Sequence, residues 1–495
     1  MNNILCHFRC PPLLPTVFAA LLILVTPFLE YAAASQSFPS PAAIQANVQF
    51  WEKIYADYSI HSAVIHDRKD LSRIYGVVSL IDKKIPGAQQ LNKALIRIRE
   101  KKYRTILHNL AAGKRPQNAE EKKIAAMFTG KKRAAQMKEA ATRLRTQTGL
   151  KERFIEGVIR SGAYMPQLKR IFITQGLPAE LAYLPHVESS FSPQAHSKSG
   201  AAGIWQFTRA TGKQYLRISS AIDERLDPFL SAKAAAAYLK NSYNKLGNWP
   251  MAITAYNYGT AGMIRAKKKL GSYERIFRFY DTGHFGFASR NFYAEYLAAL
   301  HVAQRLERTA LPCDKPISFT TLQLPGYISI ASLQRHFNIT TQTLRRFNPA
   351  LKEAIFQGKK LVPKDYQLRL PNTPALTRQK RKIPRSYLHS RQIPDKYYRV
   401  QRGDTASEIA EKYHISLKQL RNANNLDRNA AIFIGQRLRI PQRSLRKNNT
   451  KTPPLTKQKK QFRQQRQIPI LSDNKKKTPQ FTLVNSEKKK RPTRH

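Results

Sequence analysis

The C-terminal half of this chain repeats itself, and this repeat constrains the fold more than any other feature of the sequence. Four residues of the first copy recur 76 positions later: Phe337, Ile339, Leu344 and Asn348 match Tyr413, Ile415, Leu420 and Asn424. Both copies close on a strand-like ending, 368–371 and 438–441, displaced by 70 positions, so the first copy holds six extra residues. Each copy is predicted to fold as a strand, two short helices and a strand.

The chain as a whole is too long for one ordinary domain, since it has 495 residues. A charge-rich helical pattern precedes residue 150, and helical stretches separated by Gly- and Pro-marked turns follow it. The predicted organisation is a signal peptide at 1–34, a helical N-terminal region at 41–150, an α-helical domain at 151–311, a first repeat module at 317–371, a linker at 372–394, a second repeat module at 395–441 and a disordered basic tail at 442–495.

The first 34 residues resemble a secretory signal peptide. Arg9 precedes an apolar run over residues 17–29, and the small residues Ala32, Ala33 and Ala34 follow as a cleavage site. An uncleaved membrane anchor is the alternative, because the run from Leu13 almost reaches the length of a spanning helix. We therefore expect an exported protein in the periplasm or cell envelope, membrane-associated if the segment is retained.

The charge of the chain narrows its partners. Lys and Arg outnumber Asp and Glu by 86 to 31, a formal charge of +55 that attracts polyanions. Export makes nucleic acid a poor partner, which leaves the anionic cell wall or an anionic membrane surface. The tail at 442–495 has acidic charge only at Asp473 and Glu487, so we expect it to be disordered and to provide a weak, non-specific contact.

Glu188 is the first candidate for chemistry. Pro178 suits a helix start, and Leu177, Leu181, Leu184 and Glu188 then share one face at helical spacing. Desolvation on such an apolar stripe would raise the pKa of the carboxyl toward neutrality, as a general acid requires. The ordinary alternative is a helix-end residue whose carboxylate lies in water.

Two further motifs follow along the chain. In Gly200–Phe207 and Thr211-Gly212, glycines permit close backbone approach, and Trp205 and Gln206 could line a sugar cleft. In Ala255–Gly259, Tyr256 and Asn257 offer donors and acceptors suited to hydroxyl and acetamido groups. Either motif alone is equally consistent with a tight turn between helices.

Together the three motifs resemble the lytic transglycosylase family, whose SLT domain has a goose-type lysozyme fold. The matching residues are Glu188-Ser189-Ser190-Phe191, Ser197, Gly200-Ala201-x-Gly203-x-Trp205-Gln206, Thr211-Gly212 and Ala255-Tyr256-Asn257-x-Gly259. The second repeat, which opens on 398–405, resembles a LysM module. The resemblance covers roughly 43–441 and implies a mainly α fold: a lysozyme-like α-helical catalytic domain with a helical N-terminal extension, small α+β LysM-type modules and a disordered basic tail.

The resemblance also implies an activity. The family cleaves the β-1,4 bond between N-acetylmuramic acid and N-acetylglucosamine in peptidoglycan glycan strands without water, and leaves 1,6-anhydromuramoyl ends. Glu188 would be the single general acid and base. The residues that would hold the sugar are Ser189, Ser197, Gln206, Tyr256 and Asn257. We expect no cofactor and no metal, since His186 and His196 lack metal-ligand spacing.

The repeat modules carry a weaker expectation. By resemblance, Gly403, Asp404 and Thr405 would bind chains that contain N-acetylglucosamine, although capping of the following helix explains them equally well. The first module has 327–329, Tyr-Ile-Ser, at these positions. It is LysM-like but degenerate, and both sugar binding and a spacer role remain open for it.

The chain departs from the family pattern at one position, and two rival functions stay open. Many relatives carry an acidic residue in a Pro-x-Glu-Thr-x-x-Tyr-Val motif where this chain has Ala288, which puts a second acidic contact in doubt. A non-catalytic wall-binding protein could have kept the fold as a scaffold. A lysozyme-type hydrolase would have to recruit Asp223, Glu224 or Asp227, which we expect in a solvated turn, and it would leave a reducing end.

Overall fold

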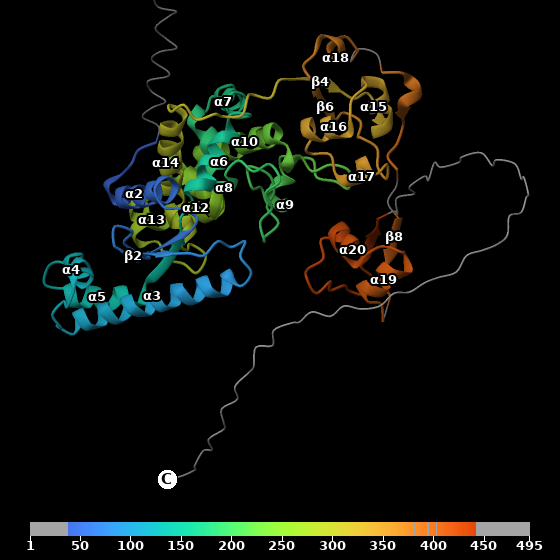
Figure 1. The fold of residues 1–495 in the computed structure, drawn as a ribbon. Helices are drawn as coiled ribbons and strands as arrows, with labels where there is room; N and C mark the ends of the chain where they lie inside the picture. Colours follow the sequence, from blue (N-terminus) through green and yellow to red (C-terminus); the bar gives the residue numbers. More distant parts are fainter. Residues whose placement is uncertain (1–37, 380–382, 394–395, 402, 442–495) are drawn as a thin grey trace, which may run out of the picture. The chain divides into compact units, whose positions relative to one another are not determined.

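The computed structural model describes residues 38–379, 383–393, 396–401 and 403–441 (Figure 1). The expected signal peptide and basic tail lie outside these ranges. Helices dominate, and short sheets occur in the N-terminal region and in the repeat modules, so the predicted fold class, mainly α with small α+β modules, is confirmed. None of the described helices combines the length and the apolar character that a membrane span requires.

The N-terminal region contains a sheet, so the prediction of a helical region at 41–150 is wrong for three of its segments. Strands β1 (Ser62–Asp67), β2 (Ile74–Ser79) and β3 (Leu144–Thr148) form an antiparallel sheet in the order β2-β1-β3. Val64 and Ile65 of the central strand are both fully buried, and a strand shielded on both faces lacks the alternation that marks a half-exposed one. The helices of this region are α2 (Ala42–Ala56), α3 (Ala88–Ala111), α4 (Ala119–Ala126) and α5 (Arg133–Thr142).

Helix α2 belongs physically to the helical domain. Phe50, Trp51 and Ile54 pack into the same core as the residues of that domain. The Asn47 side chain donates a buried hydrogen bond of 2.6 Å to the Asn291 side chain, and α2 lies along α14 (Phe287–Glu307) in Figure 1. The N-terminal region is therefore part of the support for the following domain.

The helical domain is built around α10 (Pro228–Leu246), α11 (Trp249–Tyr258) and α14, whose inward faces are rich in alanine and allow close packing. Gly247 ends α10 with a φ of 79°, and the side chain of Asn248 caps α11. The remaining elements are α6 (Lys151–Ser161), α7 (Met165–Ile173), η1 (Ala179–Tyr183), α8 (Pro185–Ser189), α9 (Arg209–Gly212), η2 (Glu224–Leu226), α12 (Thr260–Leu270) and α13 (Tyr273–Phe279).

The second repeat module has the predicted order of elements, and the first has in addition a short strand and a third helix. The second has β8 (Lys396–Arg399), α19 (Ala406–Lys412), α20 (Leu417–Asn424) and β9 (Arg437–Ile440), with β8 and β9 antiparallel. The first has β4 (Phe319–Gln323), β5 (Tyr327–Ile328), α15 (Ile330–Phe337), α16 (Thr341–Phe347), α17 (Glu353–Phe356) and β6 (Gln367–Pro371), with β4 paired to β6. The six extra residues fall between α16 and β6, the stretch that contains α17.

The expected linker at 372–394 is partly folded onto the first module. It contains α18 (Pro374–Gln379), η3 (Arg385–Tyr387) and β7 (Leu388–His389), and β7 pairs with β5. Leu376 and Leu388 pack against the core of the module. The basic and Pro-rich composition of 372–394 indicated a linker, and two isolated leucines were too few to predict packing.

The asparagine that occurs in both copies makes the same set of hydrogen bonds in each module. The Asn348 side chain accepts from the backbone N–H of Arg369 at 2.8 Å and donates to the carbonyls of Leu344 and Arg369. Asn424 makes the same three bonds, to the backbone of Arg439 and the carbonyl of Leu420. In each module the amide ties the second helix to the closing strand.

We predict that Asn424→Ala destabilises the second repeat module by about 1–3 kcal/mol, because backbone groups of Arg439 lose their partner. Asn348→Ala should cost the first module at least as much, since Asn348 is fully buried. Native-state hydrogen exchange on the full chain measures both values. Asn422→Ala, exposed on the same helix as Asn424, is the matched control and should change stability by no more than about 0.5 kcal/mol. Equal exchange in Asn424→Ala and Asn422→Ala would contradict the assignment.

Candidate active site

Glu188 lies on α8, a helix of five residues that follows η1 directly. The single helix expected over 177–188 is thus divided, because Pro185 has no N–H to donate to the preceding turn. The apolar face is as predicted: Leu181 and Leu184 are fully buried and Glu188 is half-buried. Helix α8 ends at Ser189. The next residue, Ser190, has a φ of 49°, and its carbonyl accepts a hydrogen bond of 2.8 Å from the Arg160 guanidinium.

The surroundings of Glu188 favour its protonated form. Burial, and after it the negative charge of Glu295, raise the pKa of Glu188 to about 8. Within the described part of the chain, no salt bridge or hydrogen bond to the Glu188 carboxyl is found, so nothing offsets that burial. A carboxyl in this state can donate a proton at neutral pH.

Glu295 is the residue that sequence reasoning missed. It lies on α14, half-buried, and its own pKa is raised to about 8 by burial, an effect that Arg145 partly opposes. Glu188 and Glu295 both raise the pKa of Tyr55, after burial, so the three groups share one environment. The available signal was a single acidic residue inside the apolar stretch 292–300.

The motif around Trp205 forms a compact loop, residues 195–207, which we call the cleft loop. Gly203 has a φ of 79°, and a Cβ there would lie 1.9 Å from the Arg225 carbonyl oxygen, so only glycine fits. Trp205 is fully buried and its indole N–H donates to the Pro228 carbonyl at 3.2 Å, which contradicts its expected place on the cleft wall. The Gln206 side chain is half-buried and its amide donates to the Gly203 carbonyl at 2.7 Å.

Three of the other predicted residues make contacts at this loop. The Ser189 hydroxyl donates to the Ile204 carbonyl at 2.8 Å, and the Tyr256 hydroxyl donates to the Trp205 carbonyl at 2.8 Å. Burial, and after it the negative charge of Glu188, raise the pKa of Tyr256 well above its usual value. Ser197 lies at the exposed end of the loop and accepts from the Ala201 N–H at 2.9 Å.

Asn257 follows Tyr256 and is exposed. Its side-chain oxygen accepts a hydrogen bond of 2.7 Å from the Ser289 hydroxyl. Ala288, the departure from the family motif, is exposed next to that serine. The side chain that contacts Asn257 here is therefore a neutral serine hydroxyl.

The predicted sugar-binding residues of the second module make capping contacts. Thr405 caps α19 in a reciprocal arrangement with Glu408, and the Asp404 carboxylate accepts from the Gln401 N–H at 2.7 Å. Gly403 has a φ of 93°, which the turn requires. The contacts of Thr405 are those that the capping alternative predicts, and sugar binding by the three residues stays a prediction.

The acidic residues expected in a solvated turn are buried, so that expectation is wrong. Asp223 is paired with Arg225, Glu224 with Arg217 and Asp227 with Arg369. Cations lower the pKa of Asp223 against the effect of burial. A carboxylate fixed in this way is a poor candidate for a second catalytic group.

Comparison with known proteins matches two domain families. The transglycosylase SLT domain matches residues 173–277 and the LysM domain matches 398–441. Membrane-bound lytic murein transglycosylase D of Escherichia coli strain K12 is 28% identical over 294 residues, which are 57% of this chain and 64% of the relative. The peptidoglycan transglycosylase gp16 of Escherichia phage T7 is 44% identical over 75 residues, 14% of this chain and 6% of the phage protein.

The solved structures that resemble this chain include the 70 kDa soluble lytic transglycosylase of Escherichia coli. Its TM-score is 0.26 at 18% identity, with 46% of this chain and 38% of that chain covered. The chain spans 64% of the length of the first curated relative that it matches. It therefore contains a transglycosylase SLT domain and a LysM domain, and is homologous to the lytic murein transglycosylases.

Proposed function

We propose that this chain is an exported peptidoglycan lytic transglycosylase, and that Glu188 acts as its single general acid and base. The observation that carries the proposal is a half-buried Glu188 carboxyl that has no ion pair among the described residues and whose charge acts on Tyr256, a residue bonded to the cleft loop. The match to the SLT domain supports the reaction class. The substrate would be the β-1,4 bond between N-acetylmuramic acid and N-acetylglucosamine.

The proposed reaction needs one carboxyl in two states. Glu188 first donates its proton to the glycosidic oxygen as the bond from that oxygen to C1 of the muramoyl sugar breaks. The resulting carboxylate then takes the proton of the muramoyl O6 hydroxyl as O6 bonds to C1. The products are a free 4-hydroxyl on N-acetylglucosamine and a 1,6-anhydromuramoyl end. The pKa of about 8 suits the first step at neutral pH.

Hydrolysis is the second candidate, and Glu295 is the observation that favours it. A retaining or inverting glycosidase uses two carboxyl groups, and Glu295 is a second carboxyl close enough to affect Glu188. Its own raised pKa argues against it, because a nucleophile or general base must be ionised at working pH. Mass spectrometry of digested sacculi separates the two reactions, since hydrolysis leaves a reducing end and transglycosylation an anhydro end.

We predict that Glu188→Gln lowers release of anhydromuropeptides by at least about 10²–10⁴-fold, since the amide keeps the shape but cannot exchange the proton. Tyr256→Phe should cause a smaller loss, because it removes one hydrogen bond and no proton transfer. Product release from purified sacculi is measured on variants whose circular dichroism matches that of the wild type. Appreciable turnover by folded Glu188→Gln would exclude Glu188 as the acid.

The pH dependence offers a separate test. The rate should hold up to about pH 8 and fall as the pH rises through that value, because the raised pKa of Glu188 keeps the acid protonated below it. Glu295→Gln removes the negative neighbour and should move the alkaline limb to lower pH. Glu274→Gln, exposed on α13, is the control and should leave the profile unchanged. An identical alkaline limb in Glu295→Gln would show that the two carboxyls are not coupled.

Targeting is predicted to depend on the second repeat module. Deleting 395–441 should weaken binding to sacculi yet spare cleavage of short soluble glycans, because the proposed acid lies in another domain. Co-sedimentation with purified sacculi measures the first effect and product release the second. Equal sedimentation with and without the module would refute the binding role.

A further inference from the structure

We propose that the first repeat module is a fixed support of the catalytic cleft, and that its Arg369 is a positioning residue that acts on the cleft loop through Asp227. The inference rests on the proposed function for its kinetic test. It assigns this degenerate module a structural task in place of sugar binding. The contact runs through the segment 219–227 of the helical domain, which we call the acidic segment.

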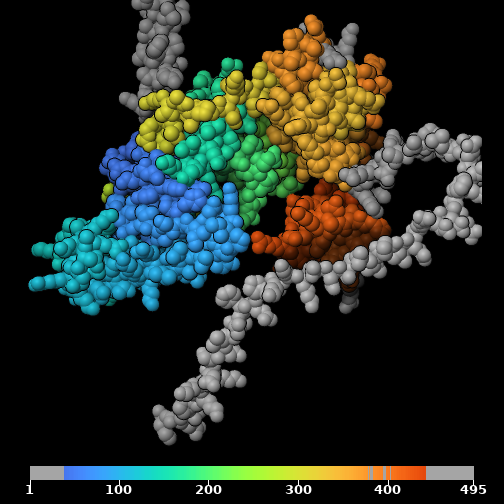
Figure 2. All heavy atoms as spheres, in the orientation of Figure 1, coloured from blue at the N-terminus to red at the C-terminus, as the bar shows by residue number. Residues whose placement is uncertain are grey.

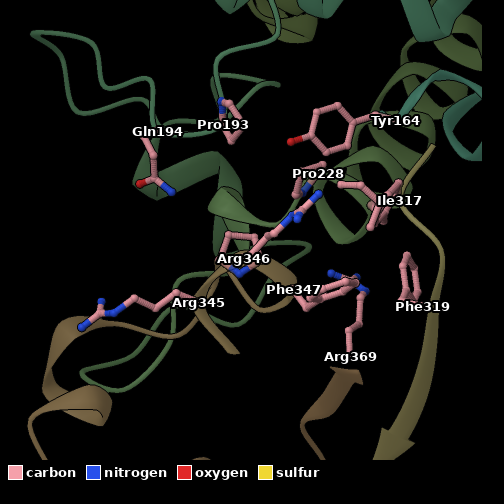
Figure 3. A pocket seen from close by; sticks show the side chains of 12 residues that line it. Tyr164, Pro193, Gln194, Pro228, Ile317, Phe319, Arg345, Arg346, Phe347 and Arg369 are labelled. Atoms are coloured by element: carbon pink, nitrogen blue, oxygen red, sulfur yellow. The ribbon is translucent and has the colours of Figure 1, made fainter. Parts of the chain in front are cut away.

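The centre of the contact is a buried ion pair between the two domains. Arg369 of β6 binds both oxygens of Asp227, with one N–H···O distance of 2.8 Å, and the two residues are 6% and 1% exposed. The guanidinium also lies 5.1 Å from the ring of Phe229 in the helical domain and 5.0 Å from the ring of Phe319 in the module. Figure 3 shows Arg369 between Phe319 and Phe347, at the edge of a cavity of about 210 Å³.

The backbones of the two parts are joined as well. The Asp223 N–H donates to the Ala350 carbonyl at 2.8 Å, and the Lys352 N–H donates to the Ala221 carbonyl at 2.9 Å, on either side of an antiparallel bridge from Ile222 to Leu351. Ala221 and Ile222 belong to the hydrophobic core of the module. The gold and orange atoms of the module adjoin the green atoms of the helical domain in Figure 2. Such a shared core is not expected of a module that merely spaces its neighbours.

Two sets of hydrogen bonds lead from the acidic segment to the cleft loop. Asp227 caps α10, and the next residue, Pro228, accepts the indole N–H of Trp205, whose carbonyl in turn accepts the Tyr256 hydroxyl. In parallel, Arg225 donates to the carbonyls of Gly200 and Phe207, at the two ends of the glycine-rich part of the loop. A shift of the acidic segment would therefore displace the loop and Tyr256 together.

The two modules differ at the positions that matter for this role. The residue that corresponds to Arg369 is Arg439, whose guanidinium donates to the Ala423 carbonyl of its own module. The first module has Tyr327 and Ile328 where the second has its Gly-Asp loop, and there β5 is paired with β7 of the following segment. The first module thus covers the tentative sugar-binding position and directs the matching arginine outward.

The test compares Arg369→Met with Arg345→Met in the full chain. Met keeps the unbranched apolar stem of arginine without its charge and adapts to the neighbouring cavity. Arg345 lines the same cavity but pairs with the exposed Glu353 of its own module. Hydrogen exchange of residues 199–207, and kcat and KM on a soluble glycan, are measured at a temperature where both variants are folded. We expect Arg369→Met to speed exchange in 199–207 and to lower kcat by up to about 100-fold, and Arg345→Met to match the wild type.

Two further variants keep the test decisive. Arg369→Lys retains the charge but not the two-pronged contact, and it replaces Arg369→Met if that variant does not fold. We expect Arg369→Lys to speed exchange in 199–207 and to lower kcat less than Arg369→Met would. Asp227→Asn keeps a good helix cap while it removes the charge, and should also speed exchange in 199–207. A lower melting temperature with wild-type kcat and wild-type exchange in 199–207 would reduce Arg369 to a stabilising residue and overturn the proposal. If the wild type releases no anhydromuropeptides, the proposed function fails, whereas the exchange measurement still decides the coupling.

Discussion

The proposed role of Glu188 depends on a carboxyl that is shielded from water and from cations, because only such a carboxyl keeps its proton near neutral pH. A rise of one in the pKa of Glu188 means that its ionised form is destabilised by about 1.4 kcal/mol relative to the protonated form. The raised pKa therefore lasts only while the packing around Glu188 excludes water. In a chain with 86 Lys and Arg residues, it is notable that burial and another carboxyl, Glu295, are the causes of the shift. Helix α8, which carries Glu188, packs against α14, α6 and η1.

The backbone is strained next to Glu188 and in the cleft loop. Ser190, Phe191 and Gln206 are non-glycine residues with φ between 48° and 55°, a conformation that costs roughly 1–3 kcal/mol each. Ser190 and Phe191 turn the chain immediately after the short helix that carries Glu188, and Gln206 turns it at the cleft loop. Hydrogen bonds from the Arg160 guanidinium to Ser190 and from the Gln206 amide to Gly203 stabilise these turns. Residues that are held in this way can fix an acid and a phenol relative to each other without a ligand.

Local sequence was sufficient for the features that local chemistry determines. The apolar stripe beneath Glu188, the glycine turn at Gly203 and the helical position of Tyr256 could all be predicted from short motifs. The repeat predicted the order of elements in the second module and all of the first except β5 and α17. The clamp made by Asn348 and Asn424 explains why that residue recurs. The pairing of β1 with β3 could not be predicted, because the strands are far apart in sequence and the central one shows no alternation. Glu295 and the burial of Asp227 were missed for the same reason, since each depends on a partner from another part of the chain.

The repeat also shows how one small fold can serve two tasks. Both modules retain the asparagine clamp and the closing strand, which are what the fold needs to be stable. What differs is the side-chain chemistry on either side of that frame. In the second module Thr405 caps the first helix and the Arg439 guanidinium donates to the Ala423 carbonyl of the same module. In the first, a covered loop and an outward arginine leave an unbalanced cation, and a cation buried among Phe229 and Phe319 is stable only if a carboxylate meets it. Asp227 provides that carboxylate from the helical domain, so the buried ion pair favours the association of the two parts.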